Sequence, residues 1–407
     1  MNGVPEAVRA ALLSLPRPRC AYVYDRAALQ ERARAVHGAL PKGSTLLYAV
    51  KANGHPDVLD ALAGVVDGFE VASAGELALA RIARAGRASS RGSASVAAAG
   101  PAHEIHFGGP GKTETELAAA VEAEATVNVE SALELRRLAV RAESAGVRVN
   151  TTLRVNRAAA VPTGSHTMTG VPTPFGIDEA QLPDVIELAW HHPAVRLVGF
   201  SLHAMSNNLD AMAHARFVAD ALAWSVATAN RHGVALRTVN VGGGFGVDYT
   251  APSGGLDLAA FARAAEDLTL PEGVRLVFEL GRYLAADAGW YAAEVLDLKQ
   301  THGRWFAVLR GGTHHFRLPA AWGYSHPFSV LPVDAWPYPY DRPEVHDAPV
   351  DAVGELCTPR DVLTRGQHVA QLRVGDMLVF ARTGAYGWDI SHHDFLRHDP
   401  PAFLITG

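Results

Sequence analysis

The sequence has little cysteine and no long uninterrupted apolar run. Its two cysteines among 407 residues, Cys20 and Cys357, are too few for a disulfide framework or a cysteine-rich metal cluster, and we expect no metal site. No stretch approaches the roughly 20 apolar residues of a membrane span. The first 15 residues lack the basic segment and apolar core of a signal peptide. We therefore expect a cytoplasmic protein with no membrane partner.

Positive charge is not in excess either. The formal net charge is -6 and the isoelectric point is near 6.3, which gives no indication of nucleic-acid binding. Hydrophobic residues make up 48% of the chain and charged residues 19%, the proportions of an ordinary globular protein. A chain of 407 residues is long enough for one large domain and one smaller domain.

From residue 21 to residue 279, strand patterns alternate with helix patterns. The expected strands are Ala21–Tyr24, Thr45–Val50, Gly68–Val71, Glu104–Phe107, Ala125–Val129, Arg148–Val155, Leu197–His203, Thr238–Val241 and Val274–Glu279. The expected helices are Arg26–Leu40, Asp57–Ala63, Ala74–Ala85, Thr113–Ala120, Ser131–Ala145, Glu179–His191, Asp210–His232 and Asp257–Leu268. Two stretches lack apolar periodicity and are expected as a mobile insertion or loop (86–100) and a long loop (156–176). Close to eight strand–helix repeats over roughly 250 residues predict an α/β fold, a (β/α)8 TIM barrel with its chemistry in the loops that follow the strands.

The character of the sequence changes after Gly281. Pro, Gly, Trp and Tyr punctuate short apolar runs there, at Trp290–Leu298, Trp305–Leu309, Met377–Phe380 and Pro401–Leu404. Such a pattern favours a β-domain, which the strand at Ala21–Tyr24 could join. We predict a barrel at 27–281 and a discontinuous β-domain formed by 1–26 and 282–407.

Lys51 stands at the end of a buried strand. The apolar run Thr45–Val50 leads directly to it, and a chain-breaking turn follows at 52–56. At such a position we expect the amine to be held away from bulk water, which lowers its pKa and favours imine formation with an aldehyde. An ordinary lysine at a strand end is the alternative.

Three consecutive glycines, Gly242, Gly243 and Gly244, follow a later strand. Their backbone N–H groups could crowd round an anion such as phosphate, and a glycine-rich turn without a ligand is an equally good reading. A dinucleotide-binding loop is disfavoured because a Pro/Gly/Ser-rich stretch, not a helix, follows. Counted from Thr45–Val50, the loop closes the seventh predicted barrel strand, a place where barrels often hold phosphate. Glu279 and Arg282 end the next strand, and Arg282 could reach the same phosphate, unless the two form a surface ion pair.

Five ordered motifs together resemble the fold-type III PLP-dependent decarboxylases, which include the diaminopimelate and ornithine decarboxylases. They are Tyr-Ala-Val-Lys-Ala-Asn around Lys51, the Gly242–Gly244 loop, Glu279-Leu280-Gly281-Arg282-Tyr283, Gly-Glu-Leu-Cys-Thr around Cys357, and Gly384-Ala385-Tyr386-Gly387. The similarity runs from about Cys20 to the C-terminus. It implies the barrel and β-domain of the alanine racemase and decarboxylase fold, with pyridoxal 5'-phosphate (PLP) as cofactor.

The resemblance assigns roles around that cofactor. Lys51 would form the imine with PLP, and Glu279 would face the pyridine nitrogen and keep it protonated, so that the ring accepts electrons. His203 would stack on the ring face, against the alternative of a satisfied core histidine. The remaining cofactor contacts would come from Glu70, Arg154, Ser206, Gly242, Gly243, Gly244, Gly281, Arg282 and Tyr386. Solvated or ion-paired roles remain open for Glu70 and Arg154, as does core packing for Tyr386.

In the resembled family a cysteine at the position of Cys357 comes from the partner subunit and protonates the carbanion after decarboxylation. The resemblance therefore implies a homodimer with shared active sites. A free cysteine that serves as a small buried hydrophobe is the alternative.

The residues after Cys357 bear on the substrate. Diaminopimelate decarboxylases usually have Glu-Ser there, and this chain has Thr358-Pro359-Arg360-Asp361. The missing glutamate disfavours diaminopimelate, and Arg360 would tolerate an acidic distal group. Arg317 resembles a carboxylate-binding arginine, with a surface arginine as the alternative. The further expected substrate contacts are Thr358, Asp361 and Tyr324.

The segment Leu202–Asp210 is similar to decarboxylases of carboxylate-siderophore pathways, which act on an amino acid joined to citrate, such as citryl-diaminopropionate. Diaminopimelate decarboxylase or another basic amino-acid decarboxylase is the alternative. A racemase of this fold typically places an arginine opposite the pyridine nitrogen, so Glu279 argues against it. A non-catalytic homologue would lose Lys51 or Cys357. A barrel that binds phosphate without PLP would lack visible absorbance.

Overall fold

A computed structural model describes residues 4–90, 104–158, 166–167, 169–251 and 254–407. The chain forms two compact units. The β-unit comprises Met1–Leu29, Asp248–Gly254 and Ala285–Gly407, and the barrel unit comprises Gln30–Val247 and Gly255–Leu284. The domain limits expected from the sequence, 27–281 against 1–26 plus 282–407, stay a prediction.

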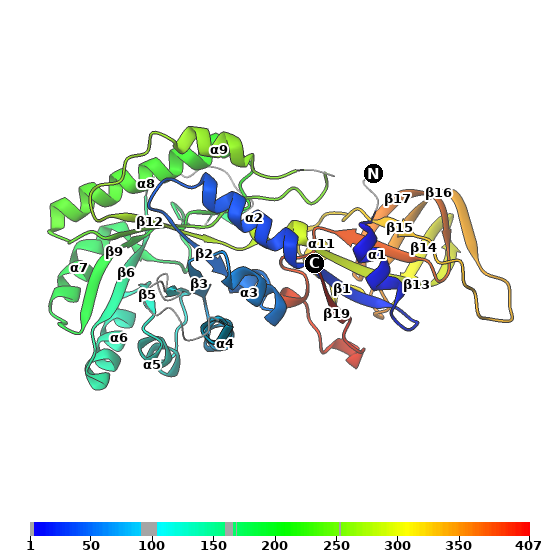
Figure 1. Ribbon diagram of the computed structural model, residues 1–407, viewed down its shortest axis with the longest axis horizontal. Helices are drawn as coiled ribbons and strands as arrows, with labels where there is room; N and C mark the ends of the chain where they lie inside the picture. The colour runs from blue at the N-terminus through cyan, green and yellow to red at the C-terminus, as the bar shows by residue number, and fades with distance from the viewer. Residues whose placement is uncertain (1–3, 91–103, 159–165, 168, 252–253) are drawn as a thin grey trace. The chain divides into compact units, whose positions relative to one another are not determined.

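Eight parallel strands form a closed barrel in the second unit (Figure 1). They are β2 (Thr45–Ala49), β3 (Gly68–Val71), β4 (Glu104–Phe107), β5 (Thr126–Val129), β6 (Val149–Asn156), β9 (Val195–Ser201), β11 (Thr238–Gly242) and β12 (Arg275–Leu280). Each strand pairs in parallel with the next, and β12 pairs with β2 to close the ring. The predicted (β/α)8 barrel is confirmed.

Helices alternate with the strands and surround the barrel (Figure 1). They are α2 (Arg26–Ala39), α3 (Pro56–Ala63), α4 (Ala74–Ser90), α5 (Glu114–Glu122), α6 (Ala132–Ala145), α7 (Leu182–Trp190), α8 (Ala211–His232) and α9 (Leu258–Ala265). Side chains cap the first turn of several of these helices, as where Asp210 accepts from Ala213 N and Thr113 forms a capping box with Glu116. In the described part of the chain, no helix combines the length and the apolar character needed to cross a membrane.

Two expectations about irregular segments need correction. Helix α4 continues through Ser90, so residues 86–90 of the expected insertion are helical, and residues 91–100 lie outside the described part. The expected long loop at 156–176 contains the two-residue strand β7 (His166–Thr167), which pairs with β10 (Met205–Ser206). Neither element carries a local apolar period, because a partner strand or the preceding helix specifies it.

A mixed sheet forms the β-unit, as expected for a β-domain. Its strands are β1 (Cys20–Asp25), β13 (Gly289–Thr301), β14 (Arg304–Leu309), β15 (Ser329–Leu331), β16 (Glu344–Val353), β17 (Val362–Arg373), β18 (Met377–Ala381) and β19 (Ala402–Thr406). The first of these, β1, pairs antiparallel with β13 and parallel with β19. The start and the end of the chain therefore meet in one sheet.

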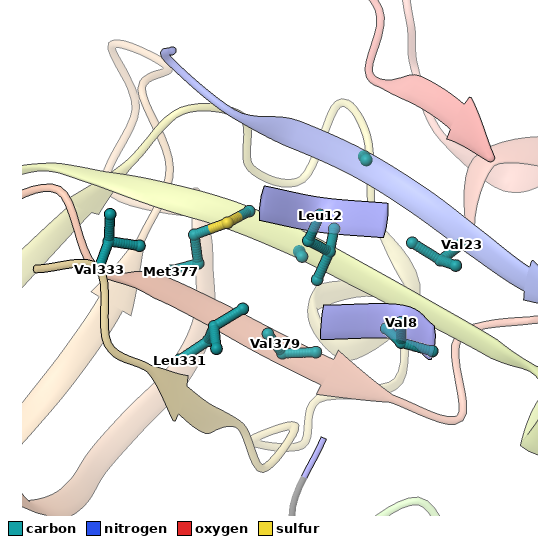
Figure 2. Close-up of a cluster of buried hydrophobic side chains, with 9 residues drawn as sticks. Val8, Leu12, Val23, Leu331, Val333, Met377 and Val379 are labelled. Carbon is teal, nitrogen blue, oxygen red and sulfur yellow. The ribbon is translucent and has the colours of Figure 1, made fainter. Parts of the chain in front are cut away.

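A short N-terminal helix covers part of this sheet. Helix α1 (Glu6–Leu13) directs Val8 and Leu12 at a cluster that includes Val23, Met377 and Val379 (Figure 2). All five side chains are buried, and Leu12, Val23 and Met377 are fully so. Burying side chains of this size stabilises the unit by roughly 1.5–3 kcal/mol each.

Candidate active site

Lys51 stands just beyond the end of β2. All five residues of the strand are buried, and the lysine follows in a 3-10 turn formed by Val50–Ala52. The turn carries the side chain past the end of the strand, so the side chain keeps 47% of its exposure. The expectation that Lys51 is held away from water was therefore wrong. A carboxylate fixes the amine instead, since Nζ donates to Glu70 Oε2 at 2.7 Å and to Oε1 at 2.9 Å.

Glu70 lies on the neighbouring strand β3, where it pairs with Ala49 in the barrel register. Its side chain is only 4% exposed. Burial raises the pKa of Glu70, the charge of Lys51 counteracts that rise, and the charge of Glu279 adds to it. The ion-paired alternative for Glu70 thus describes its arrangement, with Lys51 as the partner.

Gly281 lets the end of β12 approach the lysine turn. A Cβ atom at this position would stand 2.7 Å from the Cβ of Ala52 and 3.2 Å from the Cβ of Ala49. Contacts below 3.0 Å are too close for carbon atoms, so only glycine fits here. The segment of Glu279 and Arg282 is thereby held against the turn that carries Lys51.

Glu279 is held by two asparagine amides. Asn240 Nδ2 on β11 donates to Glu279 Oε1 at 2.6 Å, and Asn128 Nδ2 on β5 donates to the same oxygen at 3.2 Å. Thr152 fixes the Asn128 amide by donating to its oxygen at 2.6 Å. The Glu279 side chain is 10% exposed, so it belongs to no surface ion pair.

The pKa of the Glu279 carboxyl lies below its ordinary value. Burial alone would raise its pKa, but the hydrogen bond and charge of His106, together with the Asn240 amide, hold the pKa at about 2. The group is therefore an anion at neutral pH. The sequence analysis missed His106, Asn128 and Asn240, because isolated polar residues inside short strands carry no local signal.

His203 lies in the loop after β9 and contacts the glycine loop. Gly243 N donates to His203 Nδ1 at 3.2 Å, so Nδ1 is an acceptor and the proton of the neutral ring sits on Nε2. Burial, and then the positive charges of Arg154 and Lys51, lower the pKa of His203 to about 3. His203 is therefore neutral, and its stacking role and the core-histidine alternative both stay open.

Each position of the glycine loop requires glycine for a structural reason. Gly242 and Gly244 have φ of +69° and +105°, which side chains rarely adopt. A Cβ at Gly242 would collide with the His203 ring, and one at Gly243 would collide with the Glu279 carbonyl oxygen. Asn240 Oδ1 accepts from Gly242 N at 2.8 Å, so one amide holds both the loop and Glu279.

The two predicted arginines of the barrel, unlike Lys51, are largely buried, with 11% of the Arg154 side chain exposed. Arg282 begins α10 (Arg282–Ala285) and is 7% exposed. Arg154 Nη1 pairs with Glu130 Oε1 at 2.8 Å, and its guanidinium lies 4.8 Å from the Phe175 ring centre. Arg154 is thus ion-paired, the alternative considered from the sequence. Glu130 was missed, and it also accepts from the backbone N–H of Gly109 and Gly176, each at 3.0 Å.

Ser206, the remaining barrel candidate, lies in β10 beside the glycine loop. Asn208 N, two residues further on, donates to Gly244 O at 2.8 Å. The barrel unit therefore brings together Lys51, Glu70, Glu279, His203 and the glycine loop, with Ser206 on the adjacent segment.

The other candidates belong to the β-unit. Cys357 is exposed, so it is not a buried small hydrophobe, and Tyr386 has φ of +54°. A pocket of about 750 Å3 lies within this unit and is lined in part by Thr313, Arg317, Tyr324, Thr358, Arg360, Arg365 and His392. Burial, and next the charge of Arg317, lower the pKa of His392. Three of the predicted substrate contacts thus share one basic pocket with Arg360.

Asp361 does not face this pocket. It is 2% exposed, and its carboxylate accepts from Thr313 N at 2.6 Å and from Leu356 N at 2.9 Å. It packs against Gly312 and Gly354, where no Cβ would fit. The expectation of a direct substrate contact is corrected: Asp361 ties the backbone of Leu356, which precedes Cys357, to the backbone of Thr313.

The fold and the barrel residues define a class of enzyme, and comparisons with known proteins give the family. A closed parallel barrel with a rim lysine, a buried anionic glutamate and a glycine loop is typical of barrel enzymes that bind a phosphate-bearing aldehyde cofactor. The family model "Pyridoxal-dependent decarboxylase, pyridoxal binding domain" matches residues 26–286. The chain belongs to this family; it is a decarboxylase, and its cofactor is PLP.

Individual relatives cover nearly the whole chain. The 2-[(L-alanin-3-ylcarbamoyl)methyl]-2-hydroxybutanedioate decarboxylase of Staphylococcus aureus (strain NCTC 8325 / PS 47) is 39% identical, over 98% of this chain and 97% of the relative. The diaminopimelate decarboxylase of Pseudomonas fluorescens is 32% identical, over 95% of this chain and 87% of the relative. The crystal structure of the Helicobacter pylori diaminopimelate decarboxylase complexed with L-lysine has a TM-score of 0.81 at 24% identity, over 98% and 93% of the two chains, which bears on the fold.

The barrel residues fit PLP. Lys51 offers an amine at the strand end, Glu279 offers an anion for a protonated ring nitrogen, and His203 offers a neutral ring. The glycine loop offers backbone N–H groups where Cβ atoms would not fit.

Proposed function

We propose that this chain releases the α-carboxylate, as CO2, from an amino acid whose side chain ends in several carboxylates, a substrate of the citryl-diaminopropionate kind. One observation carries the proposal: the pocket in the β-unit gathers Arg317, Arg360 and Arg365. Such a reaction belongs to carboxylate-siderophore biosynthesis. The name of the Staphylococcus aureus relative describes citrate joined by an amide to the side-chain nitrogen of 2,3-diaminopropionate, which leaves two carboxylates at the distal end.

The charge of the pocket supports this substrate. All three arginines are exposed, and no carboxylate in the described ranges forms an ion pair with them. Asp361 lies nearby, but its oxygens are taken by backbone N–H groups. A guanidinium binds a carboxylate through two parallel hydrogen bonds, so three uncompensated guanidiniums suit a dicarboxylate. Thr358 follows Cys357 at the position where a site for a distal substrate ammonium would need an acidic residue.

The barrel residues divide the work of the reaction. Lys51 would hold the cofactor, which when bound would supply the electron sink for the pair left on Cα as CO2 departs. Glu279 would hold a proton at the pyridine nitrogen. Its low pKa suits it to this role, because the group is then an anion at neutral pH. His203 would stack on the ring, and the phosphate would be bound by Gly242–Gly244, Ser206, Arg282 and Tyr386. Glu70 and Arg154 complete the surroundings of the cofactor.

We further propose a cytoplasmic homodimer with shared active sites. The partner subunit's Cys357 protonates Cα after CO2 has left, and its exposure suits that role. Mixing Lys51→Ala with Cys357→Ala under conditions that let subunits exchange should recover about a quarter of wild-type activity, because one site in four then combines an intact lysine with an intact cysteine. No recovery would contradict the shared site.

Substrate comparison tests the proposed reaction. Purified enzyme with PLP should release CO2 from citryl-diaminopropionate much faster than from diaminopimelate, lysine or ornithine. Arg360→Ala or Arg317→Ala should raise the KM for the conjugate by roughly tenfold or more, since each removes a charge-assisted contact. Arg9→Ala, an exposed arginine on α1, is the matched control and should leave the KM unchanged.

Diaminopimelate decarboxylation is the second candidate, favoured by the 32% identity to the Pseudomonas fluorescens enzyme. Faster turnover of diaminopimelate than of the conjugate would establish it and refute the first. A KM for diaminopimelate that falls on replacement of Arg360 would instead support the first candidate, because it would show that the native cation repels a distal ammonium.

A further inference from the structure

A row of alternating charges runs through the inside of the barrel behind Glu279. His106 Nδ1 lies 3.5 Å from Glu279 Oε1, and His106 Nε2 lies 2.9 Å from Glu104 Oε1. Arg275 Nη1 then donates to Glu104 Oε2 at 2.7 Å. The order is therefore carboxylate, imidazole, carboxylate and guanidinium.

This row spans the barrel from one end to the other. Glu104 and Arg275 are the first residues of β4 and β12, whereas Glu279 is the last residue but one of β12. Two strands separate β4 from β12 in the sheet, so the contacts between them cross the barrel interior. The row thus links the candidate active site to the N-terminal end of the strands, where the Arg275 side chain is 40% exposed.

His106 is the centre of the row and is fully buried. Burial alone would lower its pKa, but the hydrogen bonds and charges of Glu104 and Glu279 raise the pKa to about 9. The other groups nearby are the Asn240 amide, 3.3 Å from Nδ1, Arg275 beyond Glu104, and the Lys51–Glu70 pair beyond Glu279. Two carboxylates in a dry interior require a cation between them.

We propose that His106 is a positioning residue, which stays an imidazolium between Glu104 and Glu279 and so keeps Glu279 an anion aimed at the pyridine nitrogen of the cofactor. This rests on the role proposed for Glu279. A cation behind the carboxylate weakens it as a base, so a proton shared between Glu279 and the ring nitrogen sits on the nitrogen. That location of the proton makes the ring the better electron acceptor.

The test follows the visible absorption of the PLP-loaded protein against pH, alongside kcat. In His106→Asn, Glu279 loses its cation, and the acid-side midpoint of both profiles should move up by roughly one to three pH units. In Glu104→Gln, His106 loses one of its two anions and gives up its proton more easily. The alkaline-side midpoint should then move down, with no rise on the acid side.

Glu294→Gln supplies the matched control. Glu294 is also a buried carboxylate with an arginine partner, Arg17 Nε at 2.8 Å, but it belongs to the β-unit. This variant should lower the melting temperature and leave both midpoints in place. Unmoved midpoints in folded, PLP-loaded His106→Asn and Glu104→Gln would overturn the inference. If His106→Asn does not fold, Glu104→Gln alone decides.

The absorption readout also separates this inference from the proposed function. A wild-type protein that binds PLP and releases CO2, with variants that leave the midpoints unmoved, refutes only the role of His106. A wild-type protein without the visible band refutes the proposed lysine chemistry and, with it, the ground for this role.

Discussion

The side-chain amide of Asn240 donates to Glu279 at 2.6 Å and accepts from Gly242 N at 2.8 Å, so a single residue sets the distance between the acid and the glycine loop. We predict that Asn240→Asp, which keeps the acceptor but sets a carboxylate against Glu279, lowers kcat by roughly 10- to 100-fold, the value of one charged hydrogen bond. Steady-state CO2 release measures this. Asn150→Asp adds the same charge at an exposed strand position and should have no effect. Equal kcat in both variants would contradict the prediction.

Gly242→Ala should weaken PLP binding at least tenfold. The new Cβ imposes a left-handed backbone that costs an L-residue about 1–2 kcal/mol, and it meets the His203 ring. Titration of cofactor-free protein with PLP measures the dissociation constant. Gly233→Ala separates strain from collision, because Gly233 has the same φ of +69° and no atom within 4 Å. It should lower stability and leave the dissociation constant unchanged.

Asp361→Ala should destabilise the protein by about 2–4 kcal/mol, because two backbone N–H groups lose a charged acceptor. Denaturant unfolding measures the free energy. Alkylation of Cys357 should also become faster, and Cys20 will not interfere because burial raises its thiol pKa to about 12. Asp394→Ala, which removes an exposed carboxylate, is the control. An unchanged stability with a raised KM would restore Asp361 as a substrate contact.

The charges around His106 predict how stability depends on pH. The folded pKa of His106, about 9, lies above the ordinary value of 6.5, so its contribution is complete below pH 6.5 and is lost as the pH rises through 9. The pKa of Glu279, about 2, lies below its ordinary value of 4.5, so its contribution is present above pH 4.5 and is lost as the pH falls toward 2. The difference in unfolding free energy between wild type and His106→Asn should therefore shrink, by on the order of 3 kcal/mol, between pH 6.5 and 9.

His214→Asn is the control for that profile. Burial lowers the pKa of His214 to about 4, so this histidine is neutral throughout the range. The difference in unfolding free energy between wild type and His214→Asn should stay constant from pH 6.5 to 9. A constant difference for His106→Asn as well would mean that His106 is neutral in the folded protein.

Much of the fold could be predicted from the sequence because alternating apolar patterns report strands and helices locally. The eight barrel strands all lie at predicted positions, shifted at their ends by a few residues. The extension of α4 through Ser90 and the pairing of β7 with β10 could not be predicted, since composition gives no sign of either. Short elements of this kind depend on tertiary partners rather than on their own periodicity.

Some residues of the candidate site could likewise be predicted from the sequence, and others could not. Lys51, His203, Glu279 and the glycine loop lie at or just beyond strand ends, where loops of a barrel converge, so their grouping could be predicted. Asn128, Asn240 and His106 lie within strands and meet only when the barrel closes. The prediction for Asp361 was wrong because a motif gives the position of a residue along the chain but not the direction of its side chain. The carboxylate of Asp361 points to the backbone.

Lys112 has a chemical consequence for an enzyme with an aldehyde cofactor. Its buried amine donates to Gly109 O, Asn128 O and Glu134 Oε1, so all three N–H bonds of the ammonium are occupied and no lone pair is offered to a carbonyl carbon. The sequence holds only two lysines besides Lys51 and Lys112, at positions 42 and 299. A carbonyl reagent entering this protein therefore meets very few competing lysine amines, and this scarcity favours reaction at Lys51.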